Sequence, residues 1–408
     1  MTRTLSILCA VACLALSLGH PRAGAARKDF YVTVAAGAHD RRESVVAFAL
    51  PAALNKKSYG LRDEAGQVIP LQVDAKRQAV FVLPELKAGA TKTFRVVESK
   101  AVGNSAARGV EVAQEGKRLV VKSGGRELLG FQTAPELPAG VKPVFARAGY
   151  IHPIYTPSGK LVSDDYPSDH YHHHGIWAAW TKTEFEGRHP DFWNVADGTG
   201  RIDFVGVGQK WNGSVHGGFT SRQRYVDVKA TPEKAALEEE WEVTVYRVGE
   251  GPKAYAVFDL VSTQQTSGSS PLKLEEYRYG GMGLRGHREW KDKSKVFFLT
   301  SEGKDRASGN ATRGRWCHIG GPVGGHTVGI ATFDHPSNLR APQPMRLNPD
   351  DPFFNWAPSQ MGPFEIKPGA SLVLRYRFVV ADGPPDRAEL DRLWNDYATP
   401  PQVTITQK

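Results

Sequence analysis

The stretch ALEEEWEVTVYR, residues 236–247, decides the fold class of this chain. Successive side chains of an extended strand point to opposite faces, so Trp241, Val243 and Val245 share one face. The glutamates and the threonine between them share the other face. Because an apolar face has to be buried against a second layer, the stretch predicts a strand of an antiparallel sheet with one buried side.

The same alternation recurs along most of the chain, between Gly, Pro, Asp and Asn residues that are typical of turns. Comparable stretches are DFYVTVAAGAH (29–39), RESVVAFALP (42–51), TKTFRVVES (91–99), KAYAVFDLVSTQ (253–264), HTVGIATFDH (326–335) and SLVLRYRFVVA (371–381). A hairpin is expected in EGKRLVVKSGGRELLGFQT (115–133), with its turn at Gly124-Gly125. These strands predict an all-β fold, a large antiparallel β-sandwich of the supersandwich kind.

Only the end of the chain departs from the strand pattern. In PPDRAELDRLWNDYA (384–398), Asp386 and Glu389 have the spacing of a capping box. Four apolar residues follow at helical spacing and form one face: Leu390, Leu393, Trp394 and Tyr397. We therefore expect one C-terminal helix on an all-β body.

The N-terminus has the pattern of a secretory signal peptide. Arg3 precedes LSILCAVACLALSLG, an apolar stretch at residues 5–19, and Ala23-Gly24-Ala25 offers a small-residue cleavage site. A lipoprotein cysteine at Cys13 is the alternative. We expect cleavage near Ala25 and a periplasmic or extracellular mature protein. The expected organisation is a signal peptide at 1–25, an N-terminal β-sandwich or accessory region at 26–103 and the main domain at 104–400.

Composition narrows the range of partners. After the expected cleavage only Cys317 remains, so no intrachain disulfide is expected. The formal net charge is +9, to which Arg3 and Arg22 contribute two, and the other basic residues are scattered among acids. No basic stripe with interleaved aromatic residues points to nucleic acid. No window after the signal approaches the ~20 apolar residues of a membrane helix, so we expect no membrane span.

The most unusual stretch is DHYHHHGIW, residues 169–177, which holds four of the thirteen histidines. As an extended strand it would place His170, His172 and His174 on one face. Three such imidazoles could bind one divalent metal ion (Zn, Mn, Ni or Ca), or His172 and His174 could act as a general acid and base. The third interpretation is structural packing in a crowded β core.

Aromatic and polar residues alternate just after this cluster. Flat aromatic faces beside amides and carboxylates suit a sugar ring, whose C–H face stacks while its hydroxyls form hydrogen bonds. Some of these aromatic residues could equally be core residues of a sandwich. The expected substrate-binding residues in this segment are Trp177, Trp180, Trp193 and Asn194.

Two further stretches carry candidate groups. In LEEYRYGGMGLRGHREW (274–290), a carboxylate, an imidazole and guanidinium groups flank a glycine-rich bend. Residues of these types commonly carry out general acid–base catalysis. The candidates there are Glu276, Arg285 and His287 for catalysis and Arg278 for substrate binding. In ATFDHPSNLR (331–340), Asp334 is a candidate for substrate binding and His335 for catalysis. The alternative for residues 274–290 is a purely structural role, as a solvent-exposed strand face with ion pairs.

Several motifs are absent. There is no G-x-S-x-G, and no G-x-G-x-x-G leads from a strand into a helix. A serine nucleophile elbow and a dinucleotide-binding fold are therefore not expected.

At these residues the chain resembles a known family. The run YIHPIYTPSGKLVSDDYPSDHYHHHGIWAAW (150–180), with FWN, YRYGGMGLR, TFDHPSN and PFEIKPGASLVLRYRF, is similar to the bacterial secreted PmoA-like family, labelled "methane oxygenase". The resemblance covers about residues 104–398 and implies a carbohydrate context, not a reaction. At fold level it implies similarity to galactose-mutarotase-like supersandwiches. Mutarotase catalysis is not carried over, because the only late glutamate in the strand region, Glu365, lies in an ordinary turn.

Three functions follow from these observations. The first is a secreted carbohydrate-active enzyme, a glycoside hydrolase or lyase with a His/Trp-rich cleft, with or without a metal ion. The second is a carbohydrate-binding protein without catalysis. The third is a copper-dependent oxidase, which is disfavoured because no histidine lies at the expected mature N-terminus; cleavage just before His39 would revive it.

Overall fold

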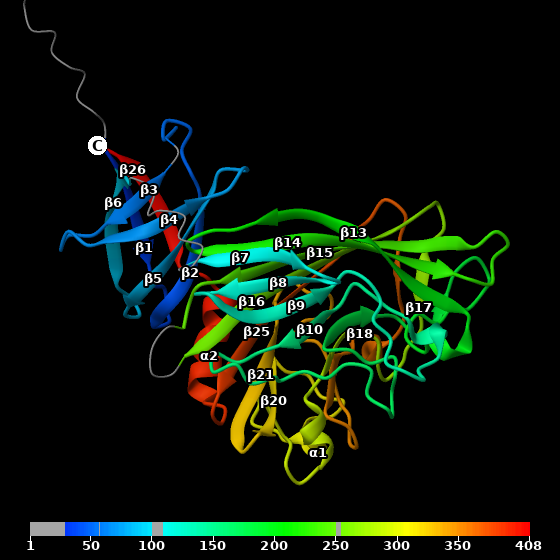
Figure 1. Cartoon of the computed structure of the whole chain (residues 1–408). Coiled ribbons are helices and arrows are strands. Elements are labelled where there is room, and N and C mark those ends of the chain that lie inside the picture. Colours follow the sequence, from blue (N-terminus) through cyan, green and yellow to red (C-terminus); the bar gives the residue numbers. More distant parts are fainter. Residues whose placement is uncertain (1–28, 57, 100–108, 250–253) are drawn as a thin grey trace, which may run out of the picture.

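The computed structural model describes residues 29–56, 58–99, 109–249 and 254–408. Strands dominate this part of the chain, so the predicted all-β class is confirmed (Figure 1). The expected signal peptide at 1–25 and the expected domain boundary at 103/104 lie outside the described residues. No helix within the described ranges is both long enough and apolar enough to cross a membrane.

A seven-stranded sheet forms a small body at one end of the molecule (Figure 1). Its core contains Val32, Phe81 and Phe94. The sheet combines both ends of the chain, because the last strand pairs antiparallel with the first one. In spatial order the strands are β2 (Arg41–Ala49), β5 (Gln78–Leu86), β4 (Val68–Val73), β3 (Tyr59–Arg62), β6 (Thr91–Glu98), β1 (Phe30–Ala35) and β26 (Gln402–Gln407).

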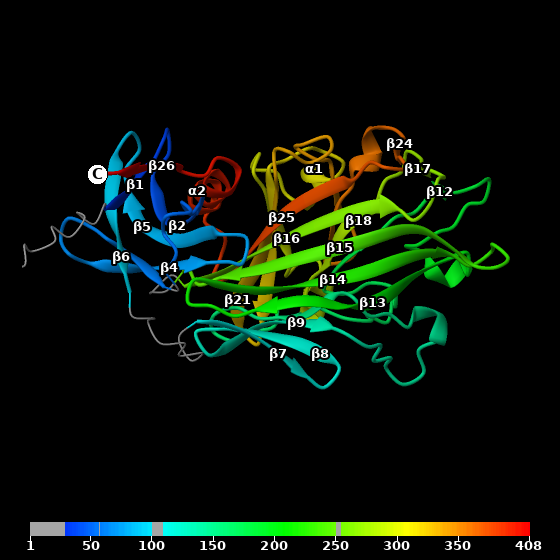
Figure 2. The same ribbon diagram turned by 90° about the horizontal axis from the view of Figure 1, so that it is seen from above.

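A sheet of eight antiparallel strands, several of them long, spans the large body (Figure 2). Trp241, Val243 and Val245 of β15 are fully buried, which confirms the inward face expected for this strand. The strands in spatial order are β13 (Gly200–Trp211), β14 (His216–Asp227), β15 (Lys234–Tyr246), β16 (Tyr255–Thr266), β25 (Leu372–Asp382), β21 (His326–Asp334), β20 (Trp316–Val323) and β19 (Phe297–Thr300).

A second eight-stranded sheet supplies the strands that position the histidine cluster. Its residues share one core with the long sheet, including Trp241 of the long sheet and Phe131 of this one. The strands in spatial order are β22 (Met345–Leu347), β23 (Phe353–Trp356), β18 (Gly281–Arg285), β11 (Ile176–Ala179), β10 (Ile151–Ile154), β9 (Arg126–Gln132), β8 (Arg118–Ser123) and β7 (Val110–Glu115).

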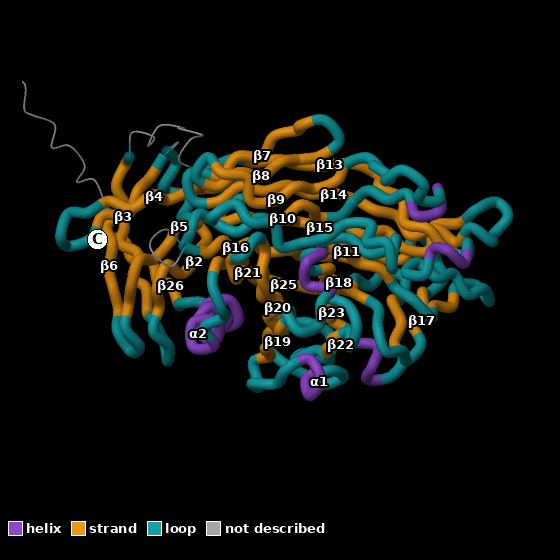
Figure 3. Tube along the Cα trace, turned by 60° about the horizontal axis from the view of Figure 1, so that its bottom comes forward, coloured by secondary structure: helices purple, strands orange, loops and turns teal. Residues whose placement is uncertain are grey.

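The remaining elements are short and lie mostly in loops (Figure 3). They are the three-stranded sheet β12 (Thr183–Glu184), β17 (Leu272–Leu274) and β24 (Phe364–Ile366), the helices α1 (Arg306–Gly309) and α2 (Arg387–Ala398), and the 3₁₀ helices η2 (Pro143–Phe145), η3 (Val195–Asp197), η4 (Arg288–Lys291) and η5 (Pro358–Met361). Glu365 therefore belongs to a short strand rather than to a turn, and it faces solvent.

The expected hairpin forms, and of the expected capping box only the Asp386 half forms, because the Glu389 carboxylate binds Arg392 instead. Strands β8 and β9 pair around Gly124 and Gly125, whose φ angles of 59° and 82° are left-handed. The Asp386 carboxylate accepts hydrogen bonds from two backbone amides at the start of α2. Helix α2 also joins the two bodies, because Asp396 forms a buried ion pair with Arg41 of β2 at 3.0 Å.

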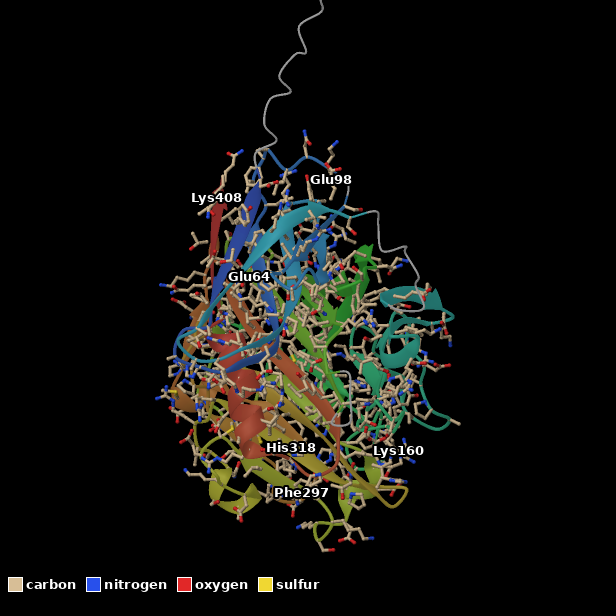
Figure 4. All side chains as sticks on the ribbon, turned by 90° about the vertical axis from the view of Figure 1, so that its left-hand side faces the viewer. Glu64, Glu98, Lys160, Phe297, His318 and Lys408 are labelled. Atoms are coloured by element: carbon tan, nitrogen blue, oxygen red, sulfur yellow. The ribbon has the colours of Figure 1, made fainter. Side chains whose placement is uncertain are left out.

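Two rings stack at the β19 edge of the long sheet. Phe297 of β19 and His318 of β20 lie nearly parallel, with ring centroids 5.6 Å apart. Figure 4 shows this pair below Glu64 and Lys408, which belong to the small body.

One inward-facing glutamate was not recognised in the sequence. Glu239 lies on the same face of β15 as Trp241 and is 1% exposed. Its carboxylate accepts hydrogen bonds from Tyr225 Oη (2.8 Å), Ser262 Oγ (2.5 Å) and Gln264 Nε2 (2.9 Å). These donors replace the lost hydration, which is the condition for burying a carboxylate in a core.

Gly175, next to the histidine cluster, packs closely against the backbone of β10, and this contact gives a stability prediction. A Cβ atom on Gly175 would lie 2.2 Å from the Ile151 carbonyl oxygen, so Gly175→Ala has to push the backbones apart. We expect it to lower the free energy of unfolding by ~1–3 kcal/mol, with a fall in melting temperature of roughly 2–4 °C per kcal/mol. Gly268→Ala is the matched control, because nothing lies within 4 Å of its Cβ position. Equal melting temperatures for the two variants would contradict this close packing.

Candidate active site

The histidine cluster lies in turns, not in a strand. His170 N donates to Pro167 O at 2.9 Å, and His173 N donates to His170 O at 2.8 Å. The strand β11 begins only at Ile176. The expectation that alternate histidines share a strand face is therefore wrong, because consecutive turns send neighbouring rings in different directions. We call residues 168–175 the histidine loop.

His174 points into the core. Its Nδ1 donates to Asp165 Oδ1 at 2.6 Å, and its ring stacks on Tyr150 at 4.1 Å between centroids. Tyr150 also donates to the same carboxylate at 2.9 Å. Burial lowers the pKa of His174 although Asp165 opposes the shift. With 1% exposure, this imidazole is a packing and hydrogen-bonding group, and it is not available to a substrate.

His173 lies in a stack of rings. Its ring is 4.6 Å from that of His170 and 4.8 Å from that of Phe353, and it is nearly parallel to both. Arg285 donates to His173 Nδ1 at 3.3 Å. Burial lowers the pKa of His173 well below its ordinary value, and His172 and Arg285 lower it further.

Arg285 links the loop to the sheet. It ends β18, its side chain is 2% exposed, and its Nη2 donates to both oxygens of Asp169 at 3.1 and 3.2 Å. Lys291 lies 3.2 Å from the same carboxylate. Because the Arg285 guanidinium is buried and already bound, it holds Asp169 and cannot itself meet a substrate, contrary to the catalytic role expected from the sequence.

Two carboxyl groups and one imidazole meet at this point. Ligand atoms of Asp169, His170 and Asp351 all lie within 4.8 Å of one another, a group that could hold a metal ion. His170 Nδ1 is 3.6 Å from Asp169 and 3.7 Å from Asp351, and it has no hydrogen bond. This set differs from the expected one, since His172 and His174 do not join His170 in any such group within the described residues.

A dication does not fit these three residues well. Asp169 is already bound by Arg285 and Lys291, and Arg285 is also 3.8 Å from Asp351. A metal ion would therefore lie beside a buried guanidinium, and like charges at such distances repel strongly where solvent is excluded. Asp169 and Asp351 are thus two neighbouring carboxyl groups that both lie beside the Arg285 guanidinium.

The environments of Asp169 and Asp351 shift their pKa values in opposite directions. Burial alone would raise the pKa of Asp169, but the charge of Arg285 and hydrogen bonds from Asp351 and Lys291 hold it well below its ordinary value. Burial and the hydrogen bond to Asp169 raise the pKa of Asp351, against the opposing charge of Arg285. Asp351 therefore holds its proton to a higher pH than Asp169 does.

His172 and His174 both line a small cavity, and His172 is the less buried of the two. Burial, with His170 and His174 next in weight, lowers its pKa to about 4. Its ring is 5.7 Å from that of His170. Together with Arg147 and Trp193 it lines a hollow of about 20 Å³, large enough for one water molecule. His172 is therefore a neutral imidazole at neutral pH, with a proton-accepting nitrogen.

The expected tryptophan wall is mostly core. Trp177 and Trp180 are 1% exposed, and Trp180 Nε1 donates to Gln264 at 2.8 Å. These two residues cannot stack on a sugar, because other side chains cover their faces. Trp193 is 3% exposed but borders the hollow, and Asn194 accepts a hydrogen bond from Tyr279 Oη at 3.2 Å.

The candidate residues from 274–290 lie in different environments and do not form one site. Glu276 and Arg278 are exposed. His287 begins η4, where its Nδ1 accepts a hydrogen bond from Glu289 N at 3.2 Å. That bond gives His287 a capping role and leaves only its other nitrogen for chemistry.

Asp334 and His335 are placed elsewhere. They lie where β21 ends near α2, with His335 5.0 Å from the Tyr397 ring. Burial raises the pKa of Asp334 to about 7, although hydrogen bonds from Asn338 and Gln343 oppose it. No contact recorded for the described residues joins either one to the histidine loop, so their expected site roles are not supported.

Asp351 and Lys291 were missed in the sequence. Asp351 belongs to NPDDPFF (348–354), in which Asn348 accepts hydrogen bonds from the backbone amides of Asp350 and Asp351. The available signal was a pair of acids in an Asn-Pro turn next to aromatic residues, but nothing local shows that this turn meets Asp169.

The buried histidines give a pH prediction. The pKa values of His172, His216 and His318 are about 4, about 4 and about 3, below the ~6.5 of an unfolded chain. The unfolded chain binds more protons in this window, so stability falls as the pH falls from ~6.5 towards 4. We expect urea unfolding of His172→Gln to show a smaller loss between about pH 7 and about pH 5 than the unaltered protein. A loss of equal size would contradict the lowered pKa of His172.

The comparisons with known proteins complete the description. No curated protein matches the sequence. Two similar solved structures are an alpha-mannosidase from Enterococcus faecalis V583 (TM-score 0.41, 10% identity, 93% of this chain and 46% of that one) and a protein in the Glycosyl Hydrolase Family 38 from Enterococcus faecalis (TM-score 0.39, 10% identity, 93% and 47%). This chain thus spans less than half the length of either. TM-scores this low support no statement about function.

Residues 118–395 match a family model described as "Family of unknown function (DUF6807)", more than half of the 408 residues. That description does not confirm the PmoA-like name to which the sequence motifs pointed. The chain belongs to the DUF6807 family.

Proposed function

We propose that this protein is a carbohydrate-active enzyme, a glycoside hydrolase or lyase, which uses acid–base catalysis at the histidine loop. The observation that carries the proposal is that His172 and Asp351 both lie next to His170: the His172 ring is 5.7 Å from the His170 ring, and the Asp351 carboxylate is 3.7 Å from His170 Nδ1. The pKa of His172 is about 4, so this imidazole is neutral and can accept a proton, whereas burial and the hydrogen bond to Asp169 raise the pKa of Asp351. A neutral imidazole and a carboxyl group with a raised pKa can act as base and acid.

In a hydrolase, the two groups would exchange protons with the glycosidic bond and water. Asp351 donates its proton to the leaving oxygen as the C–O bond breaks, and His172 takes a proton from the water that forms the new C–O bond. In a lyase, His172 removes the proton next to a carbonyl or carboxylate group, and Asp351 protonates the departing oxygen. Asp169 keeps its charge in both cases because Arg285 holds it.

The surface beside the loop supports a carbohydrate substrate. Trp193 lies 5.4 Å from Tyr279, which is 4.8 Å from Tyr277, and both tyrosines are partly exposed. Asn194 adds an amide that binds the Tyr279 hydroxyl. Half-exposed rings beside amide groups suit a sugar ring. Lys291, 59% exposed, is the cation that a developing negative charge could reach.

Substitution of the acid and the base tests this function. We expect His172→Ala and Asp351→Asn each to lower kcat by ~10²–10⁴-fold, with saccharide affinity nearly unchanged, because a positioned acid or base contributes that much. The substrate is the glycoside that gives turnover in a panel of nitrophenyl glycosides and uronic acid oligosaccharides. His335→Ala is the control, since its ring lies beside Tyr397.

The same experiment separates the enzyme from the binding protein. Retained saccharide affinity without turnover in the unaltered protein would favour a carbohydrate-binding protein. Turnover that is unaffected in both variants would reject the acid–base pair.

Metal analysis tests the interpretation of the Asp169 group. We expect protein purified without chelators to hold far less than one equivalent of zinc, manganese, nickel, calcium or copper, because Arg285 and Lys291 already neutralise Asp169. Elemental analysis beside His170→Ala measures this. One equivalent of metal, lost in that variant, would show that a cation and not a proton joins the two carboxyl groups.

A further inference from the structure

A surface of aromatic rings and cations adjoins the histidine loop. Tyr277 and Tyr279 meet edge to face, with centroids 4.8 Å apart. Lys182 Nζ lies 5.6 Å from the Tyr277 centroid, and the Arg278 guanidinium lies 5.8 and 5.7 Å from the two rings. Arg346 of β22 completes this surface, which we call the basic ledge: Lys182, Tyr277, Arg278, Tyr279 and Arg346.

The cations of the ledge lack acidic partners. Among the described residues, no carboxylate lies within 4.0 Å of Lys182, Arg278 or Arg346. Lysines nearby on the same side are paired, Lys273 with Glu184 at 2.9 Å and Lys234 with Glu186 at 2.6 Å. The ledge therefore leaves positive charge uncompensated where neighbouring surface does not.

The charges of the ledge also oppose one another. Burial, and next the charge of Arg278, lower the pKa of Arg346, whose Nη1 donates to Asn310 Oδ1 at 3.3 Å. Glu275 and Glu276 are exposed neighbours in sequence and form no ion pair within the described ranges. Two guanidinium groups that repel each other at a half-buried surface are stabilised by an anion between them.

The backbone conformation of Lys182 is a second observation that supports a ligand site at the ledge. Lys182 has a φ angle of 52°, a left-handed conformation that is uncommon for a residue with a long side chain. Its carbonyl oxygen accepts a hydrogen bond from Glu275 N at 2.9 Å. Backbone strain of this kind concentrates at ligand sites.

The ledge is continuous with the acid–base site. Tyr279 contacts Trp193, and Trp193 lies 6.1 Å from His173 in the ring stack of the loop. Arg346 pairs with Asn355 in β23, the strand that begins with Phe353 of the same stack. A ligand bound over the loop can therefore extend onto the ledge.

We propose that the ledge binds the carboxylate or sulfate groups of an anionic saccharide, with its sugar rings against Tyr277 and Tyr279. This inference rests on the proposed function and names its substrate class. Guanidinium groups bind carboxylate and sulfate oxygens through two parallel hydrogen bonds, and the tyrosine faces provide stacking.

Calorimetric titration with three tetrasaccharides tests the inference: tetragalacturonate, a chondroitin sulfate tetrasaccharide and neutral cellotetraose. We expect at least one anionic probe to bind roughly tenfold more tightly than the neutral one, and less tightly at high salt. Arg278→Gln and Arg346→Gln should each weaken the anionic probe about tenfold. Arg224→Gln, which removes an exposed arginine paired with Glu238 at 2.6 Å, is the control.

The outcomes separate the two proposals. Equal affinity for charged and neutral probes, unchanged in Arg278→Gln, overturns the anionic substrate class and leaves the acid–base enzyme intact. Binding of none of the three probes by the folded protein, together with no turnover of any glycoside, overturns the proposed function itself. Arg278 is exposed, so its variant remains informative if Arg346→Gln fails to fold.

Discussion

The bond between the buried Arg285 and the partly exposed carboxylate of Asp169 is the constraint on which the site depends. Arg285 ends a strand in the middle of its sheet, and Asp169 begins a loop that is 116 residues earlier in the chain. The guanidinium has lost its hydration, so it depends on the Asp169 carboxylate as its charged partner. By holding Asp169, the bond also fixes the turn that presents His170 and places the stacked ring of His173.

This one pairing also sets the protonation of the neighbouring groups. Because Asp169 remains charged, a second carboxyl group beside it keeps its proton more readily, and Asp351 is that group. His172 and His173 are buried, and the nearby charges of Arg147 and Arg285 lower their pKa values further, so both stay neutral. Negative charge thus remains on Asp169, while His172 and Asp351 both lie next to His170.

The fold could be predicted from the sequence because its signal is local. Alternation of side chains along 236–247 is enough to identify a strand, and Gly124-Gly125 is enough to identify a hairpin turn. The site could be predicted only in part. DHYHHHGIW identified the loop on which the proposed site lies, but the turns that orient its rings depend on contacts with β18 and with the turn at Asp351. The inward direction of Glu239 was hidden in a run of glutamates, where only register decides which one is buried.

The central claim is that His172 is a neutral base and that Asp351 holds its proton to a higher pH than Asp169 does. Its most direct test is an NMR titration of the full chain, in which the ring carbon of His172 and the carboxyl carbon of Asp351 are followed against pH. The account predicts that the pKa of His172 is about 4 and that Asp351 loses its proton at a higher pH than Asp169 does. A pKa of His172 at or above the ~6.5 of an exposed imidazole, or loss of the Asp351 proton before that of Asp169, would contradict it.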